Sequence, residues 1–100
     1  MSRRPVDSMA TTLDWADVGS SIAVWAIGSC EQHGPHLPVG LDTLMAEYFA
    51  RRVAEAFEGA LLPSLSIFQC AEHGGFRGSI SVRPETAMSW IRDVAESLEA

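Results

Sequence analysis

The chain alternates between short apolar runs and longer segments in which apolar residues recur at regular intervals. Residues 22–27 form a continuous run, IAVWAI, which is β-branched or aromatic at four of its six positions and is followed by Gly28 and Ser29. A run of this length and composition is typical of a strand buried on both faces, and such strands are usually parallel. We therefore expect a parallel strand over residues 22–27.

Residues 41–57 show the 3.6-residue period of a helix. Its apolar stripe consists of Leu41, Leu44, Met45, Tyr48, Phe49, Val53, Ala56 and Phe57. The charged residues Glu47, Arg51, Glu55 and Glu58 lie on the other side, which we expect to face water. Gly59 follows at the position of a typical helix stop.

The second half of the chain repeats this alternation. Residues 60–68, ALLPSLSIF, predict a strand that Pro63 divides into two extended pieces or confines to a sheet edge. Residues 78–82, GSISV, alternate and predict a short strand. Pro84 suits the first turn of a second helix. The apolar stripe of that helix consists of Ala87, Met88, Ile91, Val94, Ala95 and Leu98. The order strand, helix, strand, strand, helix predicts a layered α/β domain.

The two ends of the chain depart from this pattern. Residues 1–12 are polar and aperiodic, so we expect disorder there and a single domain over residues 13–100. Asp14 is the predicted N-cap of a short helical turn within residues 13–18. No strand follows the second helix, although a crossover helix normally leads into one, so we expect the fold to be incomplete.

Composition excludes several functional classes. The formal net charge is −6 and the chain contains no lysine, which argues against nucleic-acid binding and excludes Schiff-base and P-loop lysine chemistry. No apolar window approaches a membrane span or a secretory signal, so we expect a cytoplasmic protein with no membrane partner. Cys30 and Cys70 lack CxxC spacing and are expected to be reduced, partly buried thiols.

The segment that follows the first predicted strand carries the candidate chemistry. Glu31, His33, His36 and Asp42 lie in or next to a loop rich in glycine and proline. Alternate side chains of an extended segment share a face, so Glu31 and His33 in the sequence EQH can reach one metal ion together. Imidazole and carboxylate ligands suit zinc, manganese or iron. Asp42 opens the predicted helix and can return toward the loop.

Simpler interpretations exist for each residue taken alone. Asp42 can be the N-cap of the helix that follows it, and His33 or His36 can bond to backbone carbonyl groups. However, all three histidines of the chain lie in glycine-rich loops near glutamate. This clustering favours a metal or catalytic site.

A second cluster, EHGGFRG, covers residues 72–78. Glu72 and His73 are adjacent, so in an extended segment their side chains diverge and rarely bind one ion together. We assign His73 a catalytic role in shaping the pocket or moving a proton. His36, Glu72 and Arg77 are candidates for substrate binding, Arg77 by pairing with a carboxylate or an anionic substrate. The alternative is that the charged residues of this cluster are solvated on an exposed loop.

Two segments of the chain resemble the creatininase family of metal-dependent amide hydrolases. GSCEQHGPHLPVGLDT, at residues 28–43, is similar to the family signature GSxEQHGPHLPLxTD. AEHGGFRGSISV, at residues 71–82, is similar to a second family block, in which an EH pair precedes an aromatic residue, Gly-Thr or Gly-Ser, and a strand. Cys30, Leu41 and Ser79 stand where the family more often has other residues.

The resemblance implies a three-layer α/β/α fold around a mainly parallel sheet, a homo-oligomer and two divalent ions, zinc or manganese, with iron as an alternative. It implies that Glu31 and His33 bind different ions, in contrast to the single ion suggested by their spacing. It implies that Asp42 bridges both ions and that His36 is not a direct ligand. The family's remaining ligands come from a downstream block resembling NGHGGN, so the chain corresponds to the N-terminal part of an enzyme.

From these observations we expect a metal-dependent amidohydrolase in which an activated water attacks a C–N bond of an amide, cyclic amide or formamide. We expect these 100 residues alone to be inactive. The block EHGGF followed by Gly-Ser looks nearer to relatives that trim a mycofactocin-type precursor peptide than to creatinine hydrolases. The alternative from another class is a non-catalytic fragment that acts as an assembly or interaction module.

Overall fold

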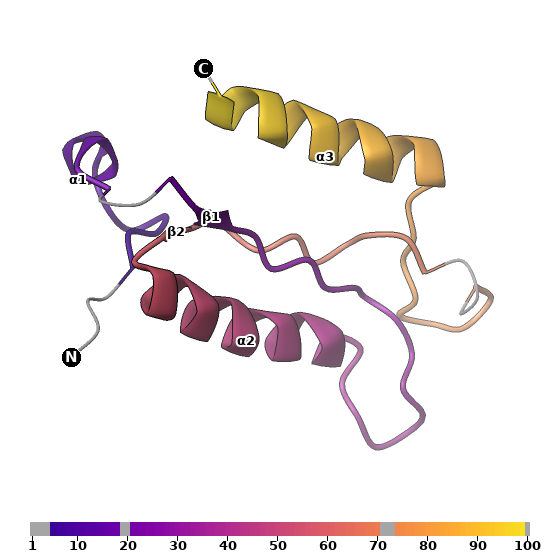
Figure 1. Cartoon of the computed structure of the whole chain (residues 1–100). Helices are drawn as coiled ribbons and strands as arrows, with labels where there is room; N and C mark the ends of the chain where they lie inside the picture. Colours follow the sequence, from indigo (N-terminus) through magenta and orange to yellow (C-terminus); the bar gives the residue numbers. More distant parts are fainter. Residues whose placement is uncertain (1–4, 19–20, 71–73, 100) are drawn as a thin grey trace.

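The computed structural model describes residues 5–18, 21–70 and 74–99 and has three layers (Figure 1). The elements follow in the order α1 (Thr12–Ala16), β1 (Ala23–Val24), α2 (Leu41–Phe57), β2 (Ala60–Leu61) and α3 (Pro84–Glu99). β1 pairs with β2 in parallel. α2 and α3 lie on opposite sides of the extended segments that contain these strands. The predicted α/β layering, the parallel pairing and both long helices are confirmed.

Pairing extends beyond the two short strands but is interrupted at Pro63, as predicted. Val24 lies opposite Leu61, whereas three residues later Ile27 lies opposite Leu65, four residues after Leu61. One extra residue on the β2 side therefore produces a bulge, and Pro63 sits within it. Past the bulge, Leu65 donates its N–H to the Ala26 carbonyl at 2.9 Å.

Two local predictions were wrong. The predicted strand at residues 78–82 is reduced to one antiparallel bridge between Cys30 and Ile80. The N-cap of α1 is Thr11, not Asp14. Asp14 is the third helical residue, and its carboxylate accepts the Thr11 N–H at 2.9 Å while the Thr11 hydroxyl accepts the Asp14 N–H. This reciprocal pair is a capping box. The sequence TTLD, residues 11–14, is compatible both with this capping box and with Asp14 as the N-cap.

Part of the segment expected to be disordered contacts the rest of the chain. The Val6 carbonyl accepts the Leu61 N–H at 2.7 Å. Asp7 lies 3.5 Å from the Arg51 guanidinium group on α2, and its carbonyl accepts the indole N–H of Trp15 at 3.0 Å. These contacts place Val6 and Asp7 beside β2 and α2.

The face of α2 that packs on the strands is made of small residues. The buried cluster consists of Ala26, Ala50, Ala54 and Leu61, with Val24 and Ala46 packed against it. The larger side chains of the predicted stripe are 44–59% exposed: Leu44, Met45, Tyr48, Phe49, Val53 and Phe57. Because these residues are small, the helix can approach the sheet closely. Apolar side chains also lie on the exposed sides of α2, so its apolar surface extends around most of its circumference. The periodicity therefore located the helix but not the face that packs on the strands.

The end of α2 also differs from the prediction. Glu58 adopts the left-handed conformation with a φ of 52°, and Gly59 follows it. Glycine is required at position 59 for another reason, because a Cβ atom there would lie 2.6 Å from the Ile22 carbonyl oxygen. Both cysteines are free thiols, as predicted. Within the described residues, no helix is long and apolar enough to cross a membrane.

The close packing of α2 on the strands predicts different responses to the same substitution at two alanines. Ala54 is 0% exposed, whereas Ala56 on the same helix is exposed. Ala54→Leu should lower the free energy of unfolding by about 1–3 kcal/mol because the added atoms have no space. Ala56→Leu should change it by less than about 0.5 kcal/mol. Urea unfolding of both variants measures the difference, and equal midpoints would contradict this packing.

Candidate metal centre

The candidate site forms where the segment after β1 passes under the first turn of α2. A Cβ atom at Gly28 would lie 2.2 Å from Oγ1 and 2.4 Å from Cα of Thr43, so only glycine permits this approach. The Gly28 N–H donates to the Leu65 carbonyl at 2.8 Å, and the Thr43 hydroxyl donates to the Ser29 carbonyl at 3.2 Å. These contacts bring the start of α2 against residues 28–33.

The structure brings Glu31, His33 and Asp42 together. One potential ligand atom from each residue lies within 4.8 Å of the others. Glu31 is buried, and the His33 and Asp42 side chains are 22% and 44% exposed, so the group opens to solvent on one side. Asp42 Oδ1 lies 3.4 Å from His33 Nε2.

The hydrogen bonds of His33 define which of its nitrogens faces the group. Nδ1 lies 2.9 Å from the Glu31 carbonyl oxygen, which can only accept a hydrogen bond, so Nδ1 carries a proton. Nε2 is then the nitrogen that faces Asp42. In a neutral imidazole this nitrogen has a lone pair, and a lone pair facing a carboxylate requires a proton or a metal ion nearby.

The two carboxyl groups are held by each other and by Ser29. The Ser29 hydroxyl lies 3.0 Å from Glu31 Oε1 and 2.9 Å from Asp42 Oδ2. The hydrogen bond with Glu31, and then that with Ser29, holds the pKa of Asp42 below its ordinary value, and the neighbouring His33 contributes less. Asp42 therefore remains ionised next to a second acidic group, which favours binding of a cation.

The simpler interpretations of these residues hold only in part. α2 begins at Leu41, and its N-cap is Gly40, without a side-chain hydrogen bond. Asp42 therefore lies within the first turn and directs its carboxylate to Ser29 and His33. His33 does bond to a backbone carbonyl, but through Nδ1, which leaves Nε2 within the group.

Neither His36 nor Arg77 belongs to this group. His36 is exposed on the loop before α2, and Arg77 is exposed on a turn. Glu72 and His73 lie outside the described residues. Ser29 and Thr43 were not predicted, although Ser29, Glu31 and His33 alternate and so share one face of an extended segment. That alternation was the available signal for Ser29.

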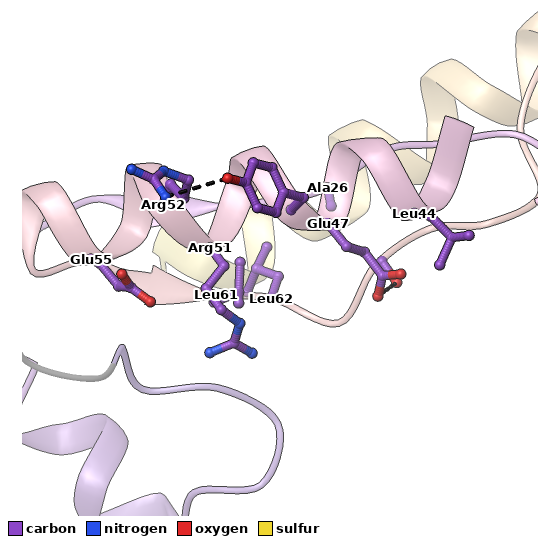
Figure 2. Close-up of a pocket in the computed structure, with 10 residues that line it drawn as sticks. Ala26, Leu44, Glu47, Arg51, Arg52, Glu55, Leu61 and Leu62 are labelled. Atoms are coloured by element: carbon purple, nitrogen blue, oxygen red, sulfur yellow. Dashed lines mark hydrogen bonds between the residues drawn. The ribbon is translucent and has the colours of Figure 1, made fainter. Parts of the chain in front are cut away.

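A cavity of about 530 Å³ lies elsewhere, between α2 and β2 (Figure 2). Its polar wall includes Glu47, Arg51, Arg52 and Glu55, and Arg52 donates a hydrogen bond to the Tyr48 hydroxyl at 3.4 Å. None of the three clustered side chains lines this cavity. The cluster of Glu31, His33 and Asp42 and this cavity are therefore separate sites.

Comparison with known proteins identifies the family. The profile of the creatininase family, described as creatinine amidohydrolase, matches residues 8–100. The chain belongs to the creatininase family. The resemblance of its two sequence blocks to that family is thus confirmed.

Two curated relatives illustrate the range of this family. A mycofactocin precursor peptide peptidase of Mycolicibacterium smegmatis is 39% identical over 62 residues, which cover 56% of this chain and 25% of the relative. A creatinine amidohydrolase of Pseudomonas putida is 28% identical over 85 residues, which cover 80% of this chain and 33% of the relative. The creatininase-family chain thus spans a quarter to a third of these relatives.

Solved creatininases share its fold. A manganese form has a TM-score of 0.82 at 24% identity, covering 95% of this chain and 40% of that structure. A zinc–zinc form of a mutant has a TM-score of 0.81 at 22% identity, covering 97% of this chain and 41% of that structure. The α/β fold with a parallel sheet is therefore that of a creatininase.

Proposed function

We propose that this chain carries part of the metal centre of an amidohydrolase that cleaves a C–N bond. One observation carries the proposal: Glu31, His33 and Asp42 place three ligand atoms within 4.8 Å of one another. One imidazole and two carboxylates form a donor set that suits zinc, manganese or iron. The solved creatininases in zinc–zinc and manganese forms support the first two.

The orientation of Asp42 supports a bridging role between two ions. Its Oδ1 faces His33 Nε2 at 3.4 Å, whereas its Oδ2 faces the Ser29 hydroxyl, which also contacts Glu31. Its two oxygens thus point toward different partners. We propose that His33 would hold one ion, Glu31 would hold the other, and Asp42 would contribute to holding both. The downstream block resembling NGHGGN that the family resemblance implies would supply further ligands.

A bound divalent ion supplies a Lewis acid that polarises a carbonyl group and lowers the pKa of water toward about 7. The residues of this chain would supply ligand atoms for that ion. Asp42 provides negative charge, Glu31 provides a further carboxyl group, and the hydrogen bond from His33 Nδ1 fixes the tautomer that leaves Nε2 as the ligand atom. The segment between β1 and α2 holds these groups together.

Among amide substrates, a peptide is the one that the relatives favour. The mycofactocin precursor peptide peptidase is 39% identical over 62 residues, whereas the creatinine amidohydrolase is 28% identical over 85 residues. We propose that a full-length protein with this segment cleaves a peptide amide. His36, Arg77, Glu72 and His73 remain proposed pocket residues, His73 as the group that shapes the pocket or moves a proton.

The two histidines of the loop offer a matched test of the metal centre. His33→Ala should weaken Zn²⁺ binding by more than the roughly 10- to 100-fold that loss of a supporting partner costs. His36→Ala should leave the affinity unchanged, because His36 is exposed and lies outside the group. Calorimetric titration of the 100-residue chain with Zn²⁺ measures both. Equal affinities of the two variants would contradict the proposed ligand set.

The alternative function is an assembly module without catalysis. The exposed apolar side chains of α2 favour it, since clustered apolar surface is typical of interaction sites. A homo-oligomer of the full-length protein is compatible with either function. The Zn²⁺ titration separates them, because an assembly module without a metal centre has no reason to bind Zn²⁺ through His33.

A further inference from the structure

Ser29 occupies a central position among the proposed ligands. Its hydroxyl oxygen lies 3.0 Å from Glu31 Oε1 and 2.9 Å from Asp42 Oδ2, and the residue is only 8% exposed. Its carbonyl accepts the Thr43 hydroxyl at 3.2 Å. Ser29 is thus fixed to the first turn of α2 through its backbone and contacts both carboxyl groups through its side chain.

A serine hydroxyl has one proton and can donate it to one acceptor at a time. Its oxygen can also accept a hydrogen bond, so the hydroxyl restrains one oxygen of each carboxyl group when one of the two groups carries a proton. For Asp42 the restrained atom is Oδ2, and the other oxygen, Oδ1, is consequently directed at His33 Nε2. A change at Ser29 would therefore alter the direction of a carboxylate without removing a ligand.

We propose that Ser29 is a positioning residue that orients the Glu31 and Asp42 carboxylates for metal binding. The inference rests on the proposed metal centre. Supporting hydrogen bonds to metal ligands typically change metal affinity by roughly 10- to 100-fold when they are lost. The side chain is buried and contacts two acidic groups that lie 2 and 13 residues away, so its effect is expected within that range.

The test compares Ser29→Ala with a matched loss of a serine–carboxylate hydrogen bond elsewhere. The Ser64 hydroxyl donates to Oε2 of Glu47, a residue of α2, at 2.9 Å. Ser64→Ala is therefore the control. Zn²⁺ affinity is measured by calorimetry, the Co²⁺ visible spectrum reports ligand geometry, and urea unfolding is followed without metal. Ser29→Ala should weaken Zn²⁺ binding by roughly 10- to 100-fold and alter the Co²⁺ spectrum, whereas Ser64→Ala should do neither.

A second pair of variants keeps the test decisive if Ser29→Ala fails to fold. Ser29→Thr and Ser29→Val have nearly the same shape, and only threonine retains the hydroxyl. Tighter Zn²⁺ binding by the threonine variant supports the positioning role, and equal binding by the two overturns it. Wild-type affinity and an unchanged Co²⁺ spectrum in Ser29→Ala also overturn it, while the metal centre stands. Absence of Zn²⁺ binding by the wild-type chain overturns the metal centre and the role of Ser29 together.

Discussion

Replacing Asp42 with asparagine should weaken Zn²⁺ binding more than any other single substitution in the chain. Asparagine keeps the shape of the side chain but removes the charge and one of the two acceptor oxygens that face His33 and Ser29. A carboxylate that bridges two ions affects both, so the loss should exceed roughly 100-fold, the upper end for a supporting partner. Calorimetric titration with Zn²⁺ and Mn²⁺ measures it.

Asp93→Asn on α3 is the control for this prediction, because Asp93 is exposed and has no part in the clustered group. Its variant should bind both ions as the wild type does. A loss in Asp42→Asn no greater than that in Asp93→Asn would show that Asp42 is not a ligand. A loss of affinity with half of the metal stoichiometry retained would contradict the bridging role alone.

Gly28→Ala should cause the largest loss of stability. The added Cβ atom would lie 2.4 Å from Cα of Thr43, which is backbone, so the strand end and the first turn of α2 must separate. The free energy of unfolding should fall by at least the upper end of the roughly 1–3 kcal/mol that overpacking usually costs. Urea unfolding measures this loss, and weakened Zn²⁺ binding should accompany it because Asp42 moves with the helix.

The control is Gly40→Ala, at which no atom lies within 4 Å of the new Cβ and the backbone is compatible with alanine. Its effect on the free energy of unfolding should stay within about 1 kcal/mol, since a weaker N-cap opposes a less flexible unfolded chain. Similar stability of Gly28→Ala and the wild type would mean that α2 does not approach the strand as closely as described.

Local rules of sequence located most of the elements of this fold. Pro84 begins α3, and the 3.6-residue period marks both long helices. The face of α2 could not be located in the same way, because Ala50 and Ala54 pack on the strands while Leu44 and Phe49 are exposed. Large apolar side chains are the stronger signal in a periodic pattern, whereas the close approach to the strands selects alanine. That selection depends on tertiary structure.

The candidate site was predictable where it depends on alternation and was missed where it depends on packing. Glu31 and His33 alternate along an extended segment, and Asp42 follows at the start of a helix, so their gathering could be predicted. Thr43 contacts this region only because Gly28 admits α2 so closely. No spacing along the chain reports such an approach between two separate elements.

The outer edge of β2 is poorly suited to pairing with another strand. Leu61 already donates its N–H there to the Val6 carbonyl, and Leu62 donates to Val24 on the opposite side. The next nitrogen that faces outward is that of Pro63, which has no hydrogen to donate. Exposed edge strands promote aggregation into fibrils, and proline is one of the residues that prevents it. Pro63 and the contact with Val6 therefore protect this edge from edge-to-edge aggregation.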